Sequence, residues 1–129
     1  AFERAVASCP DTVFLGHGPG FWAHISNDDL YDKELYPKGP VVPGGDVERM
    51  LDTYPNFWCD LSAGSALGAL SRDREHGRAF LLHYADRLLF ARDCFDGKLA
   101  AFLEELALPD NVLQAIYHDN AERLVPLSS

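Results

Sequence analysis

The sequence predicts an α/β fold in which three strand–helix units build a parallel sheet. Three short apolar runs rich in strand-forming residues alternate along the chain with amphipathic stretches of helical periodicity. The apolar runs are nearly continuous, which is typical of parallel strands, and their alternation with helices indicates βαβ units. With 129 residues the chain can bury a core of its own, so we expect residues 1–129 to form a single domain.

The first unit is preceded by residues 1–10, which are typical of the tail of an amphipathic helix. The run TVFLGH, residues 12–17, is the first predicted strand. Residues 18–44, rich in glycine, proline and aromatic residues, are expected to form a long and partly irregular connection. An amphipathic helix is predicted over residues 45–54, where Pro55 ends it.

The second and third units repeat this order. NFWCDLS (56–62) is the second predicted strand, and helix is expected in SALGAL (65–70) and over residues 73–86. RLLFARD (87–93) is the third predicted strand, and helix follows over residues 97–108. Asp110 is expected to be the N-cap of a helix beginning NVLQAIYH, and NAERLVPL (120–127) is predicted to close the chain with a short helical turn.

Composition argues against several classes of partner and location. The net charge is −9, from 20 acidic and 11 basic residues, which disfavours nucleic acid as a partner. No apolar run approaches the roughly 20 residues that a membrane span needs. Cys9, Cys59 and Cys94 are odd in number and widely spaced, so we expect a reducing, cytoplasmic location. The first residues do not resemble a signal peptide, and we expect the chain to begin within a larger architecture.

Polar residues follow each predicted strand. His17 ends the first strand, Asp60 and Ser62 lie at the end of the second, and Asp93 ends the third. Because the carboxyl ends of parallel strands meet at one edge of a sheet, His17 and Asp93 could converge on one metal ion or one water. A structural alternative exists for each: His17 as a hydrogen-bonded structural residue, Asp93 or Asp60 as the cap of the following helix.

Other catalytic motifs are not met. GHGPG, residues 16–20, is followed by Phe21 where a dinucleotide-binding fingerprint needs its last glycine. Neither Ser62 nor Ser65 lies in the G-x-S-x-G pattern of a serine hydrolase, and the sequence contains no P-loop.

Four motifs together resemble the last part of a metal-dependent amidohydrolase. These motifs are CPDTVFLGHGPGFW, YPNFWCDLSAGS, ADRLLFARDCFD and HDNAERLVPL, and the resemblance covers residues 9–127. The similarity is to the amidohydrolase-related branch that includes aminocarboxymuconate-semialdehyde decarboxylase. That family has a (β/α)8 TIM barrel, so residues 12–17, 56–61 and 87–93 would correspond to its strands six, seven and eight.

The resemblance implies a function and a set of site residues. His17 would polarise the substrate, and Asp93 would contact a divalent metal, usually zinc, and shuttle the proton of its bound water. The implied reaction is hydrolysis of an amide, ester or lactone, or decarboxylation of a small acid. Trp22, His24, Asp60 and Arg92 are expected to contact the substrate, and the charge of Arg92 would suit an acidic one.

The resemblance also implies a missing part. The family's His-x-His on strand one and its histidine on strand five are absent, because those strands are absent. A barrel needs about 250 residues, so we expect the chain to meet an N-terminal half-barrel or to form a homo-oligomer. The alternative is a non-catalytic half-barrel fragment or binding module that lacks the metal site.

Overall fold

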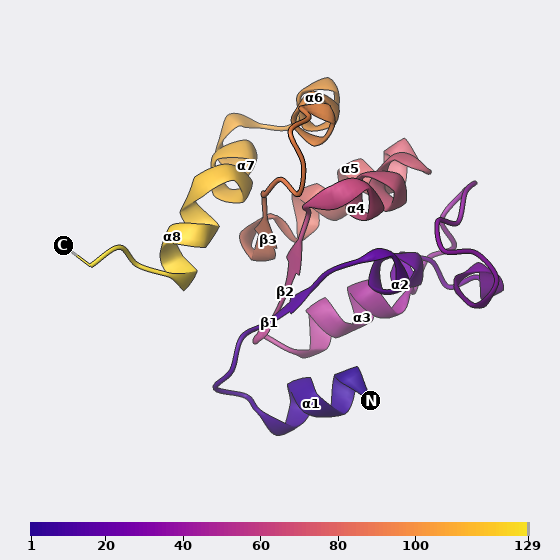
Figure 1. Ribbon diagram of the computed structural model, residues 1–129, viewed down its shortest axis with the longest axis horizontal. Coiled ribbons are helices and arrows are strands. Elements are labelled where there is room, and N and C mark those ends of the chain that lie inside the picture. Colours follow the sequence, from indigo (N-terminus) through magenta and orange to yellow (C-terminus); the bar gives the residue numbers. More distant parts are fainter. Residues whose placement is uncertain (129) are drawn as a thin grey trace.

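The computed structural model describes residues 1–128 and contains a three-stranded sheet with helices between its strands (Figure 1). The strands are β1 (Phe14–Gly16), β2 (Phe57–Asp60) and β3 (Leu88–Leu89). The α-helices are α1 (Phe2–Ser8), α2 (Pro19–Trp22), α3 (Asp46–Thr53), α4 (Ala63–Ser71), α5 (Arg74–His83), α6 (Lys98–Glu105), α7 (Asp110–Gln114) and α8 (Asn120–Leu124). Three 3-10 helices, η1 (Ala23–Ile25), η2 (Asp29–Asp32) and η3 (Ala85–Arg87), and the π-helical η4 (Ala115–Asp119) complete the elements.

The sheet is parallel, with β2 between β1 and β3, so the predicted α/β class is confirmed. Leu15 pairs with Trp58, and Asp60 pairs with Leu89. Since side chains alternate along a strand, these four residues share one face of the sheet. The other face carries Phe14, Phe57, Cys59 and Leu88.

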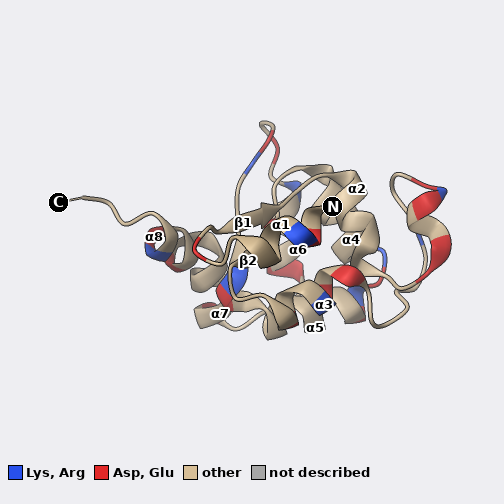
Figure 2. Ribbon diagram, turned by 90° about the horizontal axis from the view of Figure 1, so that it is seen from below, with Lys and Arg blue, Asp and Glu red and all other residues tan. Residues whose placement is uncertain are grey.

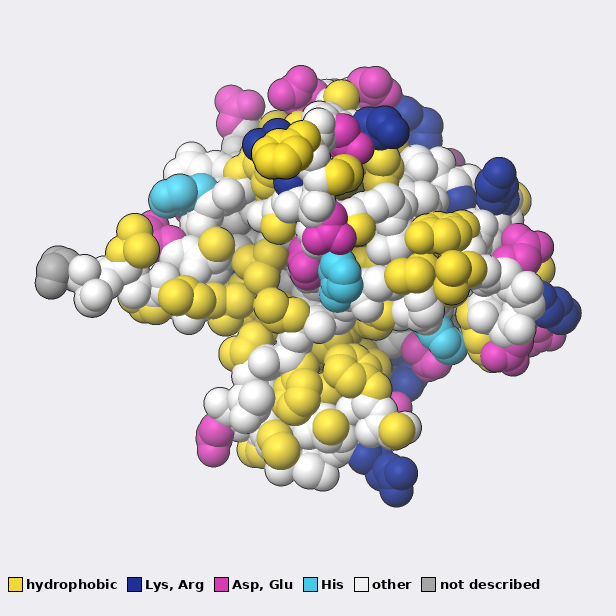
Figure 3. Space-filling model, viewed as in Figure 1, with side chains coloured by type: hydrophobic (Ala, Val, Ile, Leu, Met, Phe, Trp, Pro, Cys, Tyr) yellow, Lys and Arg dark blue, Asp and Glu magenta, His cyan; other side chains and the backbone are white. Residues whose placement is uncertain are grey.

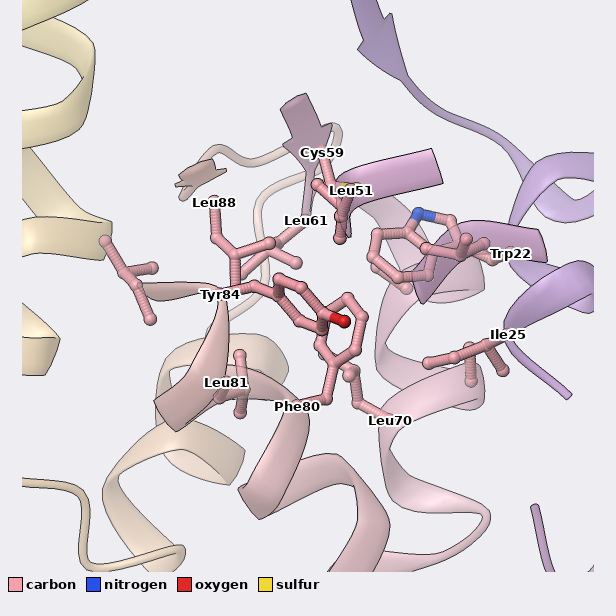
Figure 4. Packing of buried hydrophobic residues seen from close by; sticks show 14 of the residues in the cluster. Trp22, Ile25, Leu51, Cys59, Leu61, Leu70, Phe80, Leu81, Tyr84 and Leu88 are labelled. Carbon is pink, nitrogen blue, oxygen red and sulfur yellow. The ribbon is translucent and has the colours of Figure 1, made fainter. Parts of the chain in front are cut away.

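This second face packs against the helices and forms the core (Figure 4). Phe57, Cys59 and Leu88 are fully buried. Their neighbours in the core come from α2 to α5, and the largest of them are Trp22, Ile25, Leu51, Leu70, Phe80 and Leu81. Burial in these surroundings raises the pKa of the Cys59 thiol far above its usual range.

The first face of the sheet is largely open. Val13 is 44% exposed and Leu15 is 48% exposed, whereas Trp58 is buried and lies beneath the Arg123 guanidinium, 5.0 Å from its ring centroid. Hydrophobic side chains form a band between the C-terminal segment and the lower lobe that contains α1 (Figure 3). This face of the sheet therefore exposes two large aliphatic side chains.

Two buried asparagines hold the chain where it enters β1 and β3. Asn56 Nδ2 lies 3.0–3.1 Å from the carbonyl oxygens of Val6, Cys9 and Thr12, which shape the turn before β1. Asn120 Nδ2 donates to the carbonyl oxygens of Ala85 and Leu88, at 2.6 and 2.8 Å. The asparagine of the HDNAERLVPL motif thus fixes the start of β3, and its burial makes this role structural.

Two predicted boundaries are wrong. The third strand was expected over residues 87–93 but pairs only at Leu88–Leu89, because Phe90 N donates to Ile116 O instead of to a strand. Asp110 is the first residue of α7 and not its N-cap. Pro109 takes that position, and its carbonyl accepts from Val112 N and Leu113 N. Asp110 still lies in the first turn, where a carboxylate favours the helix dipole.

Among residues 1–128, no helix is both long enough and apolar enough to cross a membrane. Cys9, Cys59 and Cys94 are free thiols. Acidic positions gather on the loop that carries η2, at the right of Figure 2, while lysines and arginines are dispersed among acidic residues elsewhere.

Candidate active site at the carboxyl ends of the strands

His17 and Asp60 meet at the carboxyl end of the sheet. His17 follows β1 directly, and Asp60 is the last residue of the neighbouring strand β2. The Nδ1 atom of His17 lies 3.2 Å from Asp60 Oδ2 and 3.4 Å from Ser62 Oγ. The imidazole is 44% exposed, so the rest of its ring remains open to a ligand.

The glycines on either side of His17 explain the local path of the chain. A Cβ on Gly16 would lie 2.3 Å from the Phe21 ring, so the strand can approach α2 only with glycine there. Gly18 has a φ of 92°, a left-handed conformation that turns the chain from β1 into α2. The two glycines therefore place His17 at a sharp strand-to-helix turn, with its side chain beside β2.

Asp60 is itself firmly held. Ser62 N donates to Asp60 Oδ1 at 2.8 Å, which closes an Asx-turn, and Ser62 Oγ donates to Asp60 Oδ2 at 3.0 Å. Asp60 does not cap α4, because Ser62 is the residue at the N-cap. For Ser62, a polar residue at the end of the second predicted strand, the structural alternative was also a cap of the following helix; it does occupy the N-cap position of α4, but its side chain makes no capping hydrogen bond.

Trp22 was expected to wall a substrate pocket, but it lies in the core. Its indole is 1% exposed, and Nε1 donates to the carbonyl oxygen of Asp60 at 3.3 Å. The side chain joins α2 to the end of β2, so Trp22 supports the position of Asp60 from the buried side of the sheet.

Asp93 and Arg92 lie on the exposed connection after β3. They line a pocket of about 200 Å³ together with residues of the first turns of α4 and α6, and His17 is not among the lining residues. The alternative role of Asp93 as a helix cap is not realised, because Gly97 is the N-cap of α6. It is Asp96 Oδ1 that accepts the Lys98 backbone N–H, at 3.1 Å.

Cys94 in the same connection donates its thiol to Asp96 Oδ2 at 3.3 Å. This hydrogen bond, together with the Asp96 charge, raises the pKa of Cys94. The thiol therefore stays protonated at neutral pH, which makes Cys94 a poor nucleophile and a poor metal ligand in this conformation. Cys94 is exposed.

His24 occupies a different surface. Its ring stacks on Tyr31 at 4.3 Å between centroids, and Nδ1 lies 3.6 Å from Asp46 Oδ2. It lines a pocket of about 470 Å³ between α1, α2 and α3, with Phe21, Arg49 and Met50 among its walls. The structure thus separates three of the predicted residues, since His17, His24 and Asp93 each have different neighbours.

The side chains of residues 1–128 do not form a metal site by themselves. Within residues 1–128, no three or more histidine, cysteine, aspartate or glutamate side chains come together in a way that could hold one. A zinc site needs about three protein ligands, so the residues of this chain do not fit zinc by themselves.

Comparison with known proteins decides the family. A family model described as amidohydrolase matches residues 1–127, nearly the whole chain. The chain belongs to the amidohydrolase family. This confirms the resemblance predicted from the four motifs and supports a function of the hydrolase or decarboxylase type. Searches of curated proteins and of solved structures found no match.

Proposed function

We propose that this chain is the carboxyl-terminal part of an amidohydrolase that hydrolyses a small amide, ester or lactone, or decarboxylates a small acid. The observation that carries the proposal is the His17–Asp60 contact of 3.2 Å at the carboxyl ends of two adjacent parallel strands. This edge of an α/β sheet is where catalytic groups and ligands gather. In this proposal the three strands correspond to strands six to eight of a (β/α)8 barrel.

The proposed roles follow from what each side chain presents. His17 leaves Nε2 open to polarise a substrate carbonyl or to exchange a proton with it. Asp93 supplies an exposed carboxylate that can accept a proton. Arg92 lines the same pocket, where its guanidinium can bind the carboxylate of an acidic substrate.

The open face of the sheet supports an assembly. β1 and β3 are the two edges of the sheet in residues 1–128. Val13 and Leu15, at the β1 edge, are about half exposed. Burying such apolar surface contributes roughly 25 cal/mol per Å². We therefore propose that the active form contains a complementary half-barrel, with a homo-oligomer as the other arrangement that covers these edges.

A divalent metal, zinc in this proposal, requires ligands from that complementary part. Asp93 is the residue of this chain that would join those ligands. The free thiols of Cys9 and Cys94 support a reducing, cytoplasmic location.

Fragment complementation tests the proposal. The 129-residue chain is mixed with strands one to five of a full-length amidohydrolase-family enzyme, in the presence of Zn²⁺, and assayed on small amides, lactones and aromatic acids. We expect turnover in the mixture, and His17→Asn or Asp93→Asn to lower kcat at least about 100-fold. Phe95→Ala is the matched control, because Phe95 is fully exposed next to the same pocket.

The second candidate function is a non-catalytic half-barrel or binding module. It is favoured by the lack of a metal-binding cluster within residues 1–128. A folded complex in the complementation test that turns over none of the substrates would support this candidate and contradict the enzyme.

A further inference from the structure

The contacts of Asp60 suggest a different role from the substrate contact that the sequence predicted. We infer that Asp60 is a positioning residue, which keeps a proton on Nδ1 of His17 and so makes Nε2 the atom that exchanges protons with a substrate. This inference rests on the proposed function and names the working atom of its histidine.

Two side chains lie next to the Nδ1 atom of His17. Asp60 Oδ2 lies 3.2 Å from Nδ1, and a carboxylate can only accept a hydrogen bond. Ser62 Oγ lies 3.4 Å from Nδ1, but its proton is directed to Asp60 Oδ2, 3.0 Å away. Both neighbours therefore act as acceptors toward the ring, and only an N–H at Nδ1 satisfies them.

The carboxylate of Asp60 is held on both of its oxygens. Ser62 donates to both of its oxygens, through N at 2.8 Å and through Oγ at 3.0 Å. The backbone of Asp60 is held in turn by the buried Trp22 indole, which donates to its carbonyl oxygen. A carboxylate fixed on both oxygens cannot rotate away, so the ring of His17 has one favoured orientation.

The consequence concerns proton exchange at the other nitrogen. The ring with protons on both nitrogens can donate from Nε2–H to a substrate oxygen. When that proton is transferred, the neutral ring keeps its proton on Nδ1 and carries a lone pair on Nε2. The same nitrogen can then take a proton back, while the Nδ1–H···Asp60 hydrogen bond is kept throughout.

The imidazole nitrogens report this arrangement directly. We would record long-range ¹H–¹⁵N correlations of the ¹⁵N-labelled chain at a pH where the rings are neutral, with His17→Gln identifying the His17 signals. We expect the Nδ1–H tautomer in the wild-type chain. Asp60→Asn is expected to reverse it, because the Asn amide can donate to Nδ1 and leave the proton on Nε2.

Two further variants keep the test sharp. Ser62→Ala removes one hydroxyl but leaves the Asp60 carboxylate 3.2 Å from Nδ1, so it should keep the Nδ1–H tautomer and show that the carboxylate, not the hydroxyl, sets it. Asp46→Asn is the matched control, since Asp46 faces His24 and should leave the His17 signals unchanged.

The outcomes separate this inference from the proposed function. A wild-type His17 with its proton on Nε2, a tautomer that Asp60→Asn leaves unchanged, or one that Ser62→Ala reverses would overturn the role of Asp60 even in an active enzyme. An Nδ1–H tautomer in a protein without turnover would uphold the role of Asp60 as a positioning residue and count against the enzyme.

Discussion

The connection after β1 and the connection after β3 carry the two proposed catalytic residues, and they are built in opposite ways. The first is long, yet its Ile25, Ser26 and Val41 are buried. The second spans residues 90–97, and every residue from Ala91 to Gly97 is exposed. The longer connection is therefore the more buried of the two. Buried side chains and long-range hydrogen bonds hold it against the rest of the chain.

Arg72 accounts for much of this difference. Its side chain is 3% exposed and reaches from the end of α4 into the long connection. There it donates to the carbonyl oxygens of Gly39, Lys38 and Pro40 and forms an ion pair of 3.0 Å with Asp28. The next residue, Asp73, accepts the backbone N–H of Val41 at 3.1 Å. After β3, Phe90 N makes one long-range hydrogen bond, to Ile116 O, and the hydrogen bonds found from Ala91 to Gly97 are local, such as those to Asp96.

The two connections differ in how strongly a docked segment would affect them. The His17 side of the site is organised by contacts within the chain, whereas the Asp93 side lacks a comparable long-range anchor in residues 1–128. A segment that docks on the open face of the sheet would therefore change the position of Asp93 more readily than that of His17.

The largest expected effect comes from two aromatic truncations. Trp22→Ala removes a buried indole from the first connection and should lower the free energy of unfolding by about 3–5 kcal/mol. Phe95→Ala in the second connection should change it by less than about 0.5 kcal/mol, because Phe95 is fully exposed. Urea unfolding followed by circular dichroism measures both, and comparable losses would contradict the difference between the connections.

A pair of arginine truncations is the next test. Arg72→Ala removes the ion-pair partner of the partly buried Asp28 carboxylate and the donor to three carbonyl groups, so we expect a loss of about 3 kcal/mol. Arg92→Ala is the matched control in the second connection, where we expect less than about 0.5 kcal/mol. If Arg72→Ala proved as mild as the control, the arginine would not be what orders the long connection.

Lowering the pH should destabilise the first connection. Burial alone would raise the pKa of Asp28, but hydrogen bonds from Ser26, Leu30 N and Arg72 lower it below its usual 3.8. Hydrogen bonds from the backbone N–H groups of Val41 and His76 likewise lower the pKa of Asp73. Because both folded-state values are depressed, this stabilisation is complete above about pH 4 and is lost as the pH falls through the folded values.

Hydrogen exchange can follow that loss. Protection factors of the Leu30 and Val41 amides, whose acceptors are Asp28 and Asp73, should fall once the pH drops below about 4 and passes through the lowered pKa values of these carboxyl groups. The Phe90 amide, which donates to the Ile116 carbonyl, is the control and should keep its protection over the same range. Equal losses at all three amides would point to global unfolding instead.

The smallest expected effect concerns Asp93 and zinc. Because residues 1–128 offer no cluster that could hold a metal, Zn²⁺ at about 100 µM should raise the free energy of unfolding by less than about 0.5 kcal/mol. Asp93→Asn should change neither that result nor the stability of the metal-free chain, as measured by thermal unfolding. A stoichiometric, tightly held zinc would show that the chain carries a complete site.

The sequence by itself determined the order of strands and helices, the parallel sheet and the family. Near-continuous apolar runs, helical periodicity and four motifs are local signals, and they are read without knowing which residues meet in space. They also placed His17 and Asp60 at strand ends, because strand ends are marked by the change from apolar to polar residues, whereas Asp93 lies on the connection beyond β3.

Only the tertiary structure decided which of these residues touch. Asp60 pairs with His17 because β1 and β2 are neighbours whose register places the two ends together. Trp22 is buried in the core, where α2 packs against α4 and the indole donates to the carbonyl oxygen of Asp60. Arg72 gave no local signal, since its partners lie more than thirty positions away in sequence along the connection that it anchors. Long-range pairing of this kind depends on the packing of the whole chain, and a single sequence pattern does not contain it.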